Sequence, residues 1–550
     1  MASLLQEGIM KNVISLMYLL FFLSSGPGWR GNGMVEKYPW WNEEQRKLAD
    51  EVEEFAKEKV PRAAEATWKK EFPWDIYNEM GGRGWFGTII PEEYGGLGPR
   101  YGVTACCIVA ELTTPLGSVC VAFSTTMFGG THQIAHFGNE EQKERWLPGI
   151  AKGKLMGAIT LTEPFVGSDA GGVETTARRE GDEYVILGKK RFISNTGLAD
   201  IYMVYARTSD DPKDIASRRH LSAFIVEKGT PGFSVEKINE LSGWDGVRNG
   251  YLNFDEVRVP AENRLGEEGD GWNIMVSGLN FERTLGAAGI VGTFRDLITY
   301  AVFHSQRRVQ FNRPTATFQT NMIKLADVIA NWKTYRLLTY YAAYLVDRGE
   351  QPLIEATAAK VYGSEAVTKA CLDMIQVMGG DGLTKFYPLE YAMRSAKIME
   401  IGAGTNEVLR LLIARFGLRL LAKELEPPKR RIHKELGVPI PYYKAEPLMP
   451  EGTPVNEENV LKVLAEDYRV NPGLFMTVED LAFELRVDPA SMDKLEEALT
   501  GLEEKGLVKI YRDRAGRIAL AKATYKGLKE ANPPEYYRWF PSWVKEGEMF

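Results

Sequence analysis

One acidic residue lies on an apolar helical face and is the first candidate for chemistry. Met275, Leu279, Glu282, Gly286 and Gly289 recur at three- and four-residue spacing, so a helix would place them on one side. A carboxylate among apolar and glycine residues is seldom a simple solvated side chain, because burying its charge is costly. Glu282 is therefore a candidate general base, and the alternative is an ion pair buried for packing.

A glycine-rich turn before a predicted helix is the second candidate. It contains Gly402, Ala403, Gly404 and Thr405, and Glu407 follows in the first turn of that helix. The N–H groups at a helix N-terminus have no intrahelical acceptor and suit anionic or electron-rich ligand atoms. The turn is therefore predicted to bind a ligand.

Three longer segments carry further polar, glycine and aromatic residues in a fixed order. The first is Leu-Thr-Glu-Pro at 161–164, Gly-Ser-Asp at 167–169 and Lys-Arg-Phe-Ile-Ser-Asn at 190–195; the second is Arg-Val-Gln-Phe at 308–311 with Phe318 and Gln319; the third is Gln-Val-Met-Gly-Gly-Asp-Gly at 376–382, then Tyr387, Arg394 and 401–407. Taken singly, a Phe-Ile pair is usually core and an Arg-Arg pair is usually solvated. Their joint order is what argues for a site.

The elements that must position these residues change character twice. Residues from about 42 to 155 are helical in pattern, with Asn42 as N-cap and Pro61 expected to end the first helix. Short apolar runs at 184–187, 202–205 and 223–226 predict strands in a β region that ends near Pro260. Helical patterns return from Gly271 to about 423.

This α, β, α order and the three segments resemble the acyl-CoA dehydrogenase family over about residues 38 to 423. The resemblance implies a multidomain α and β fold: an N-terminal helical domain at 34–156, a middle β-barrel domain at 157–265 and a C-terminal four-helix bundle at 266–424. It also implies FAD as cofactor and an acyl-CoA as substrate.

The resemblance assigns a role to each motif residue. The backbone of 159–162 would contact the flavin edge, Phe192 would pack on the flavin, Ser194 would approach its N5, and the 308–319 segment would reach FAD in a neighbouring subunit. The implied FAD-binding residues are Ile159, Leu161, Thr162, Phe192, Ser194, Arg308, Gln310, Phe311, Gln319, Gln376, Gly380, Thr405 and Glu407. The implied substrate-binding residues are Ser168, Asn280, Arg283 and Gly402.

Two positions depart from the family pattern. Asn312 replaces the glycine of a Phe-Gly-Arg turn, which Asn can survive because it tolerates positive φ. Ala403 stands where many members carry the catalytic glutamate. The isovaleryl-CoA and long-chain branch carries its base on an earlier helix, in a motif similar to 279–283 here, so Glu282 is the implied base. The Ala403 N–H can still stabilise charge on the thioester oxygen.

The implied reaction converts an acyl-CoA to the trans-2-enoyl-CoA. Glu282 would remove the pro-R α-proton while the flavin accepts a hydride from the β-carbon. Substrate binding should desolvate Glu282 and raise its pKa. The resemblance further implies an electron-transferring flavoprotein as acceptor and a homodimer or homotetramer. Acyl-CoA oxidase and enoyl-CoA reductase activities would use the same site and stay open, as does a DNA-binding flavoprotein of this fold.

Composition narrows the other possibilities. The net charge of −7 argues against a polyanion-binding protein as a whole. Five His and four Cys, the latter without CxxC spacing, indicate neither a metal site nor a disulfide framework, and a reducing cytoplasm fits best. The apolar run at 13–23 is too short to span a bilayer comfortably, so residues 1–33 are interpreted as a leader or a mis-assigned start before Met34, and no stable membrane span is expected.

A separate C-terminal module follows a linker. Prolines punctuate residues 425–455, and beyond them three helices (456–468, 478–485 and 489–505) and a hairpin (508–511 with 518–521) resemble a winged helix. Residues 456–550 carry 14 Lys and Arg against 18 Asp and Glu, a net charge of −4, so nucleic acid is not the expected partner. A protein contact is expected instead, involving the aromatic tail at 536–540.

Overall fold

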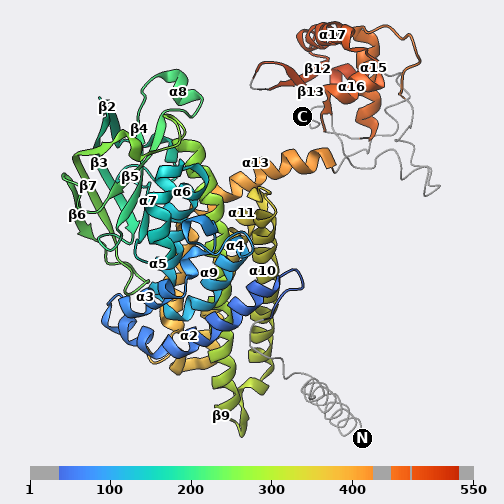
Figure 1. Cartoon of the computed structure of the whole chain (residues 1–550). Coiled ribbons are helices and arrows are strands. Elements are labelled where there is room, and N and C mark those ends of the chain that lie inside the picture. The colour runs from blue at the N-terminus through green and yellow to red at the C-terminus, as the bar shows by residue number, and fades with distance from the viewer. Residues whose placement is uncertain (1–35, 425–446, 471–473, 514, 532–550) are drawn as a thin grey trace, which may run out of the picture. The chain divides into compact units, whose positions relative to one another are not determined.

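The computed structural model describes residues 36–424, 447–470, 474–513 and 515–531 of the chain. The chain divides into two compact units between Leu418 and Arg419, and each is described by itself (Figure 1). The predicted leader, most of the linker and the aromatic tail lie outside the described residues. Among the described helices, none is long and apolar enough to cross a membrane.

The first unit begins with helices that build much of its core. These are α2 (Glu43–Lys69), α3 (Trp74–Gly82), α4 (Gly102–Thr113), α5 (Ser118–Thr126), α6 (His132–Phe137) and α7 (Glu140–Ala151). Asn42 caps α2 as predicted, because its side chain accepts a hydrogen bond from the Gln45 N–H at 2.8 Å. A π-helical turn at Met127–Thr131 joins α5 to α6.

Pro61 does not end α2, so that prediction is wrong. The helix continues through Pro61 to Lys69 and closes where Lys70 adopts a left-handed conformation (φ 56°). Pro61 and Lys57, whose carbonyl loses its helical donor, are both exposed. Water can therefore hydrogen-bond the freed carbonyl, while Ala63 and Ala66 continue the buried face.

The middle of the unit is a single mixed sheet. Its strands are β1 (Gly157–Thr160), β2 (Thr176–Glu180), β3 (Glu183–Ser194), β4 (Ile201–Arg207), β5 (Leu221–Glu227), β6 (Phe233–Ile238), β7 (Asn249–Pro260) and β8 (Arg264–Leu265), with the short helix α8 (Pro212–Ala216) between β4 and β5. The order is β6-β7-β3-β2-β4-β5-β8, and β1 pairs in parallel with β4. Along the described strands the path runs from β6 to β8 without a pairing between these two ends, so the structure shows the predicted middle β domain as a mixed sheet rather than as a ring of hydrogen-bonded strands.

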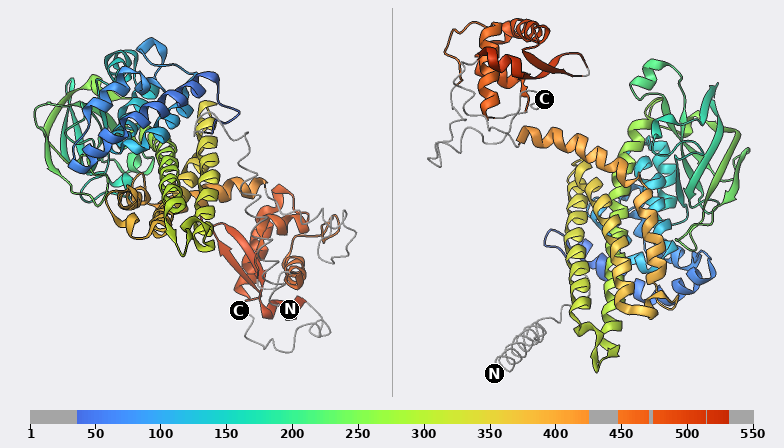
Figure 2. Two further views of the ribbon diagram at one scale, coloured as in Figure 1. Left: turned by 90° about the horizontal axis from the view of Figure 1, so that it is seen from below. Right: turned by 180° about the vertical axis from the view of Figure 1, so that it is seen from behind.

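Long helices complete the first unit. They are α9 (Gly271–Arg307), α10 (Gln319–Asp347), α11 (Leu353–Met378), α12 (Leu389–Ile401) and the part of α13 (Asn406–Glu424) up to Leu418. Helices α9, α10 and α11 pack against one another, and α9 also packs on α4 of the N-terminal part (Figure 2). The helix α9 thus lies between the N-terminal helices and the other C-terminal helices, which buries Glu282's neighbours on both sides.

A two-residue hairpin joins α9 to α10. Its strands are β9 (Val309–Gln310) and β10 (Arg313–Pro314), paired antiparallel. Phe311 and Asn312 between them both have positive φ, 51° and 61°. This geometry is that of a tight β-hairpin turn, and Asn312 supports it as predicted.

The second unit has a small core of its own. Its elements are α15 (Glu457–Val470), β11 (Met476–Thr477), α16 (Val478–Glu484), α17 (Met492–Glu504), β12 (Val508–Arg512), β13 (Ile518–Ala523) and α18 (Tyr525–Ala531). The three helices and the hairpin lie close to the predicted positions, and β11 adds a third strand beside β13. Leucine side chains from all three helices, including Leu464, Leu481 and Leu499, meet in the core.

Candidate active site

Glu282 lies in the first half of α9 and has an unusual electrostatic environment. Burial raises the pKa of its carboxyl from 4.5 to about 7, and the cations Arg283 and Lys360 oppose that rise. The side chain keeps some solvent-accessible area, although protein atoms closely surround the carboxylate. The burial of the carboxylate, rather than the exposure of the rest of the side chain, sets the pKa, because desolvation acts on the charged atoms. A carboxyl of this kind can exchange protons near neutral pH.

Arg283 connects the Glu282 helix to the glycine-rich turn. Its guanidinium donates to the Asn280 Oδ1 at 3.1 Å and to the Ala403 carbonyl at 3.4 Å. Arg283 is buried, and burial lowers its pKa while the neighbouring Glu282 raises it. The predicted residues Asn280, Glu282, Arg283 and Ala403 are therefore brought together.

The turn from Gly402 to Thr405 has a conformation that an L-residue rarely adopts. Helix α12 ends at Ile401, and Ala403 and Gly404 follow with φ of 58° and 94°. No hydrogen bond of normal geometry joins the Ala403 N–H to another described residue. Thr405 then starts α13 by accepting at its Oγ1 from the Val408 N–H at 3.5 Å. Ala403 is thus left with an available donor beside the Arg283 helix.

A buried lysine on α11 lies against this turn, and the sequence motifs did not indicate it. Lys360 donates to the carbonyls of Glu400 at 3.2 Å and Gly404 at 2.8 Å, and to the Asn406 Oδ1 at 2.8 Å. The available signal was a lone cation on a small-residue helical face with Ala356, Ala359 and Gly363.

The segment after β1 is fixed by a second buried pair. The Lys190 ammonium on β3 donates to the Glu163 carboxylate at 2.8 Å, to the Tyr205 carbonyl at 2.6 Å and to the Leu161 carbonyl at 3.3 Å. Glu163 also accepts from the N–H groups of Glu174 and Thr175 at 2.6 and 3.0 Å. Burial would raise the Glu163 pKa, but Lys190 and these hydrogen bonds hold it below the ordinary value.

Phe192 projects from an interruption in the β3–β7 ladder. The register shifts between Lys190 and Ile193, and Phe192 has φ of 58° with 48% of its surface exposed. The Arg191 N–H donates to the Thr162 carbonyl at 2.7 Å, which ties this bulge to the segment after β1. Ser194 at the end of β3 and Ile159 on β1 are partly buried, whereas Ser168 is exposed.

The remaining predicted residues form a distant group. From Glu282 to Arg308, α9 is continuous, and about 1.5 Å per residue puts the two roughly 40 Å apart. His304, near the end of α9, contacts Asp381 at 2.7 Å, so Gln376 and Gly380 belong to the same end as the β9–β10 hairpin (Figure 1). The exposed predicted residues at this end are Arg308, Gln310, Phe311, Gln319, Gln376 and Gly380. Glu407 is exposed too, but it lies on α13 beside the turn.

A histidine and a glutamine near Glu282 also escaped the sequence analysis. The His132 ring on α6 stacks on Phe281 with centroids 4.9 Å apart, and its Nε2 lies 3.0 Å from the Ser277 Oγ. Burial lowers the pKa of His132 to about 3, so it stays neutral. Gln133 is fully buried against Gly278 of α9. No local motif marks such contacts, because they join residues far apart in sequence.

Comparison with known proteins decides the family. Three family descriptions match in order: the acyl-CoA dehydrogenase N-terminal domain at 42–154, the middle domain at 158–257 and the C-terminal domain at 269–418. The chain belongs to the acyl-CoA dehydrogenase family. It is similar to the acyl-CoA dehydrogenase of Bacillus subtilis, with 41% identity over 68% of this chain and 98% of that protein.

Two further acyl-CoA dehydrogenase relatives bear on the assignment. The mitochondrial isovaleryl-CoA dehydrogenase of Pongo abelii is 34% identical over 68% of this chain and 88% of its own length. The solved structure of butyryl-CoA dehydrogenase from Megasphaera elsdenii aligns with a TM-score of 0.67 and 33% identity, covering 70% of this chain and all of that one. These family matches end before the second unit.

This member of the acyl-CoA dehydrogenase family is an oxidoreductase whose cofactor is FAD, and the site has features that suit a flavin. The exposed Phe192 ring offers an apolar surface, and positive φ at a bulky residue is a strained arrangement typical of ligand sites. The buried Arg191 Nε beside it has no hydrogen-bond partner among the described residues. An aromatic surface next to an unsatisfied cationic donor fits a planar ring whose nitrogen and carbonyl oxygen atoms accept hydrogen bonds.

Proposed function

We propose that this enzyme dehydrogenates an acyl-CoA thioester to the trans-2-enoyl-CoA, with Glu282 as the base. The observation that carries the proposal is the enclosed Glu282 carboxyl, whose pKa of about 7 lets it accept a proton near neutral pH. Ala at position 403 cannot take a proton, so the turn itself supplies no competing base. Bound FAD supplies the hydride acceptor for the β-carbon.

The Ala403 turn supports the other half of the chemistry. An α-proton becomes acidic only when charge that develops on the thioester oxygen is stabilised. The Ala403 N–H is an available donor in the turn, and the neighbouring Arg283 provides a positive charge that is hydrogen-bonded to the Ala403 carbonyl. Asn280, Arg283, Gly402 and the exposed Ser168 are proposed to hold the substrate in register with Glu282.

The distant group of residues supports a homodimer or homotetramer. Arg308, Gln310 and Phe311 lie too far from Glu282 in their own chain to share its ligand, and Phe311 is 89% exposed. A second copy can bring this group to the FAD held by Thr162, Phe192 and Ser194. Arg308 would then contribute charge to the FAD pyrophosphate, and Gln319, Gln376 and Gly380 would complete that cofactor surface.

An electron-transferring flavoprotein is the proposed acceptor. Acyl-CoA oxidase and enoyl-CoA reductase activities remain alternatives because the same residues would serve both. The cysteines are free and buried, which suits the reducing cytoplasm we propose as its location.

One experiment separates these activities. Purified protein should be yellow with one FAD per chain, and an anaerobic panel of straight and branched acyl-CoA thioesters should identify one that bleaches it. Reoxidation is then compared with an electron-transferring flavoprotein, a dye and oxygen. Colourless protein that FAD cannot reconstitute, or bleaching by none of the thioesters, contradicts the proposal.

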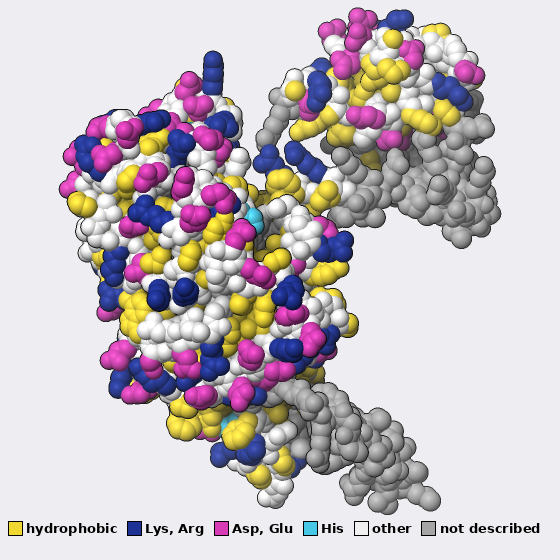
Figure 3. Space-filling view, viewed as in Figure 1, with side chains coloured by type: hydrophobic (Ala, Val, Ile, Leu, Met, Phe, Trp, Pro, Cys, Tyr) yellow, Lys and Arg dark blue, Asp and Glu magenta, His cyan; other side chains and the backbone are white. Residues whose placement is uncertain are grey.

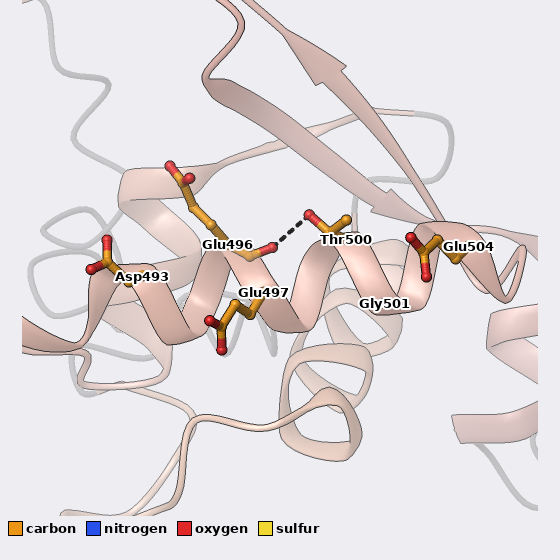
Figure 4. A pocket seen from close by; sticks show the side chains of 6 residues that line it. All are labelled: Asp493, Glu496, Glu497, Thr500, Gly501 and Glu504. Atoms are coloured by element: carbon orange, nitrogen blue, oxygen red, sulfur yellow. Dashed lines mark hydrogen bonds between the residues drawn. The ribbon is translucent and has the colours of Figure 1, made fainter.

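We further propose that the second unit is a winged-helix-like module for protein contact rather than DNA binding. The third helix, α17, would face the major groove in a DNA reader. Its outer side instead presents Asp493, Glu496, Glu497 and Glu504 (Figure 4). On the face of the first unit drawn in Figure 3, side chains of both charge signs are interspersed. Salt-sensitive binding of full-length protein to duplex DNA at physiological ionic strength would contradict this role.

A further inference from the structure

Lys360 is a buried cation whose hydrogen bonds go to uncharged acceptors among the described residues. It is 1% exposed on α11. Its three hydrogen-bond acceptors are the carbonyls of Glu400 and Gly404 and the side chain of Asn406. Burying an ammonium is costly, so these neutral acceptors must replace the water that it loses. All three acceptors come from one short segment of chain, which encloses Ala403.

The contacts of Lys360 bracket the strained residue of the turn. Ala403 with φ of 58° lies between the two carbonyls that Lys360 binds, and a left-handed conformation is unfavourable for an L-residue. Asn406, the third acceptor, is itself held by Ser364 of α11 at 3.0 Å. Helix α11 therefore holds the turn on both sides of Ala403.

The same ammonium contributes to the field at Glu282. Arg283 from α9 and Lys360 from α11 both lower the Glu282 pKa against the effect of burial. The Tyr205 hydroxyl from β4 also faces Glu282, and burial keeps it protonated by raising its pKa. Burial and Arg283 lower the Lys360 pKa to about 8, while Glu282, Glu400 and Glu407 raise it. Lys360 is therefore charged at neutral pH.

We infer that Lys360 is a positioning residue, whose ammonium holds the Ala403 turn in its donor-presenting conformation and supplies part of the positive charge that Glu282 needs as a base. The inference deepens the proposed function and rests on it. Lys360 touches neither substrate nor flavin in this role, because its three donors are directed at the turn.

The test compares substitutions of Lys360 in the FAD-loaded enzyme. Lys360→Met removes charge and hydrogen bonds, Lys360→Gln keeps hydrogen-bonding capacity without charge, and Lys360→Arg keeps the charge. Lys369→Met, on the same helix but exposed and paired with Asp373, is the matched control. Three quantities are measured: the pH dependence of flavin bleaching by the fastest acyl-CoA of the panel, hydrogen exchange of a peptide spanning 398–409, and the thermal midpoint.

Lys360→Met should slow bleaching by about 10²-fold, the loss that a misplacement of about 1 Å can cause. The acid limb of the pH profile, which is the pH range in which the bleaching rate falls as Glu282 becomes protonated, should move to higher pH, because the Glu282 carboxylate loses a stabilising cation. Hydrogen exchange of the 398–409 peptide should accelerate. Lys360→Gln should move the acid limb in the same direction. Lys360→Arg should keep the acid limb at its wild-type pH and keep part of the wild-type bleaching rate. Lys369→Met should match wild type in all three quantities.

The contrary outcome is a lower thermal midpoint with an unchanged acid limb and unchanged exchange in 398–409, which would make Lys360 merely structural. If Lys360→Met fails to fold, the acid limbs of the Gln and Arg variants decide the question in the same way. Glu282→Gln keeps the two proposals distinct: if that variant bleaches normally, the proposed base is wrong. If it is inactive while all Lys360 variants match wild type, only the positioning role is overturned.

Discussion

Replacing Glu282 by Gln should change the stability of the protein relative to wild type more favourably at pH 8 than at pH 5. In the folded protein burial raises the Glu282 pKa from 4.5 to about 7. A carboxyl whose folded pKa is raised contributes stability that is fully present below the unfolded pKa and lost as pH rises through the folded one. Between pH 4.5 and about 7 the wild-type protein therefore loses stability that the Gln variant, which does not titrate, retains.

The size of this loss follows from the pKa itself. Each tenfold change in proton affinity is worth about 1.4 kcal/mol. The full difference between the unfolded and folded pKa values would therefore lower the free energy of unfolding by roughly 3 kcal/mol. The Glu282 side chain keeps some solvent access, so we expect about 1–3 kcal/mol. The burial of the Gln amide has its own cost, but that cost is the same at every pH.

Thermal unfolding of the FAD-loaded protein measures this difference, with flavin fluorescence reporting on the first unit. The midpoint of Glu282→Gln minus that of wild type should increase from pH 5 to pH 8, with most of the increase complete near pH 7. Glu54→Gln, which removes an exposed carboxylate on α2, should show no such trend. An equal midpoint difference at pH 5 and pH 8 would refute the raised pKa and its assigned cause.

Two further results are expected. Glu282→Gly combined with Ala403→Glu should recover part of the flavin bleaching lost in Glu282→Gly alone, because both positions can approach the same α-carbon; no recovery would show that the turn cannot direct a carboxylate there. Truncation after Glu451 should leave FAD content and bleaching unchanged but slow electron transfer to an electron-transferring flavoprotein, and unchanged transfer would argue against partner contact by the second unit.

Local sequence patterns predicted the features that depend on neighbouring residues. The helical spacing around Glu282, the Asn42 cap and the positive φ of Asn312 each follow from a few adjacent residues and their backbone preferences. The three strand segments were predicted for the same reason, since short apolar runs of β-branched and aromatic residues between turn residues are local signals. Most of the secondary structure around the candidate site could thus be predicted from the sequence.

Features that depend on tertiary packing were not predicted. The contacts of Lys360 with residues 400–406 and the Glu163–Lys190 pair join separate segments, which no spacing rule reveals. Pro61 was expected to end a helix, but the exposure of the freed carbonyl made continuation tolerable. Barrel closure depends on pairing between edge strands that lie far apart in sequence, and the described strands show no pairing between β6 and β8.

Flavin bleaching in Glu282→Gln tests the central claim most directly. The substitution keeps the size of the side chain and removes its ability to take a proton. Mixed anaerobically with the acyl-CoA that reduces wild type fastest, the variant should bind FAD and substrate normally, while the bleaching rate constant should fall by roughly 10²–10⁴-fold, the usual worth of a positioned base. A near-normal rate constant in a fully FAD-loaded variant would remove Glu282 from the mechanism.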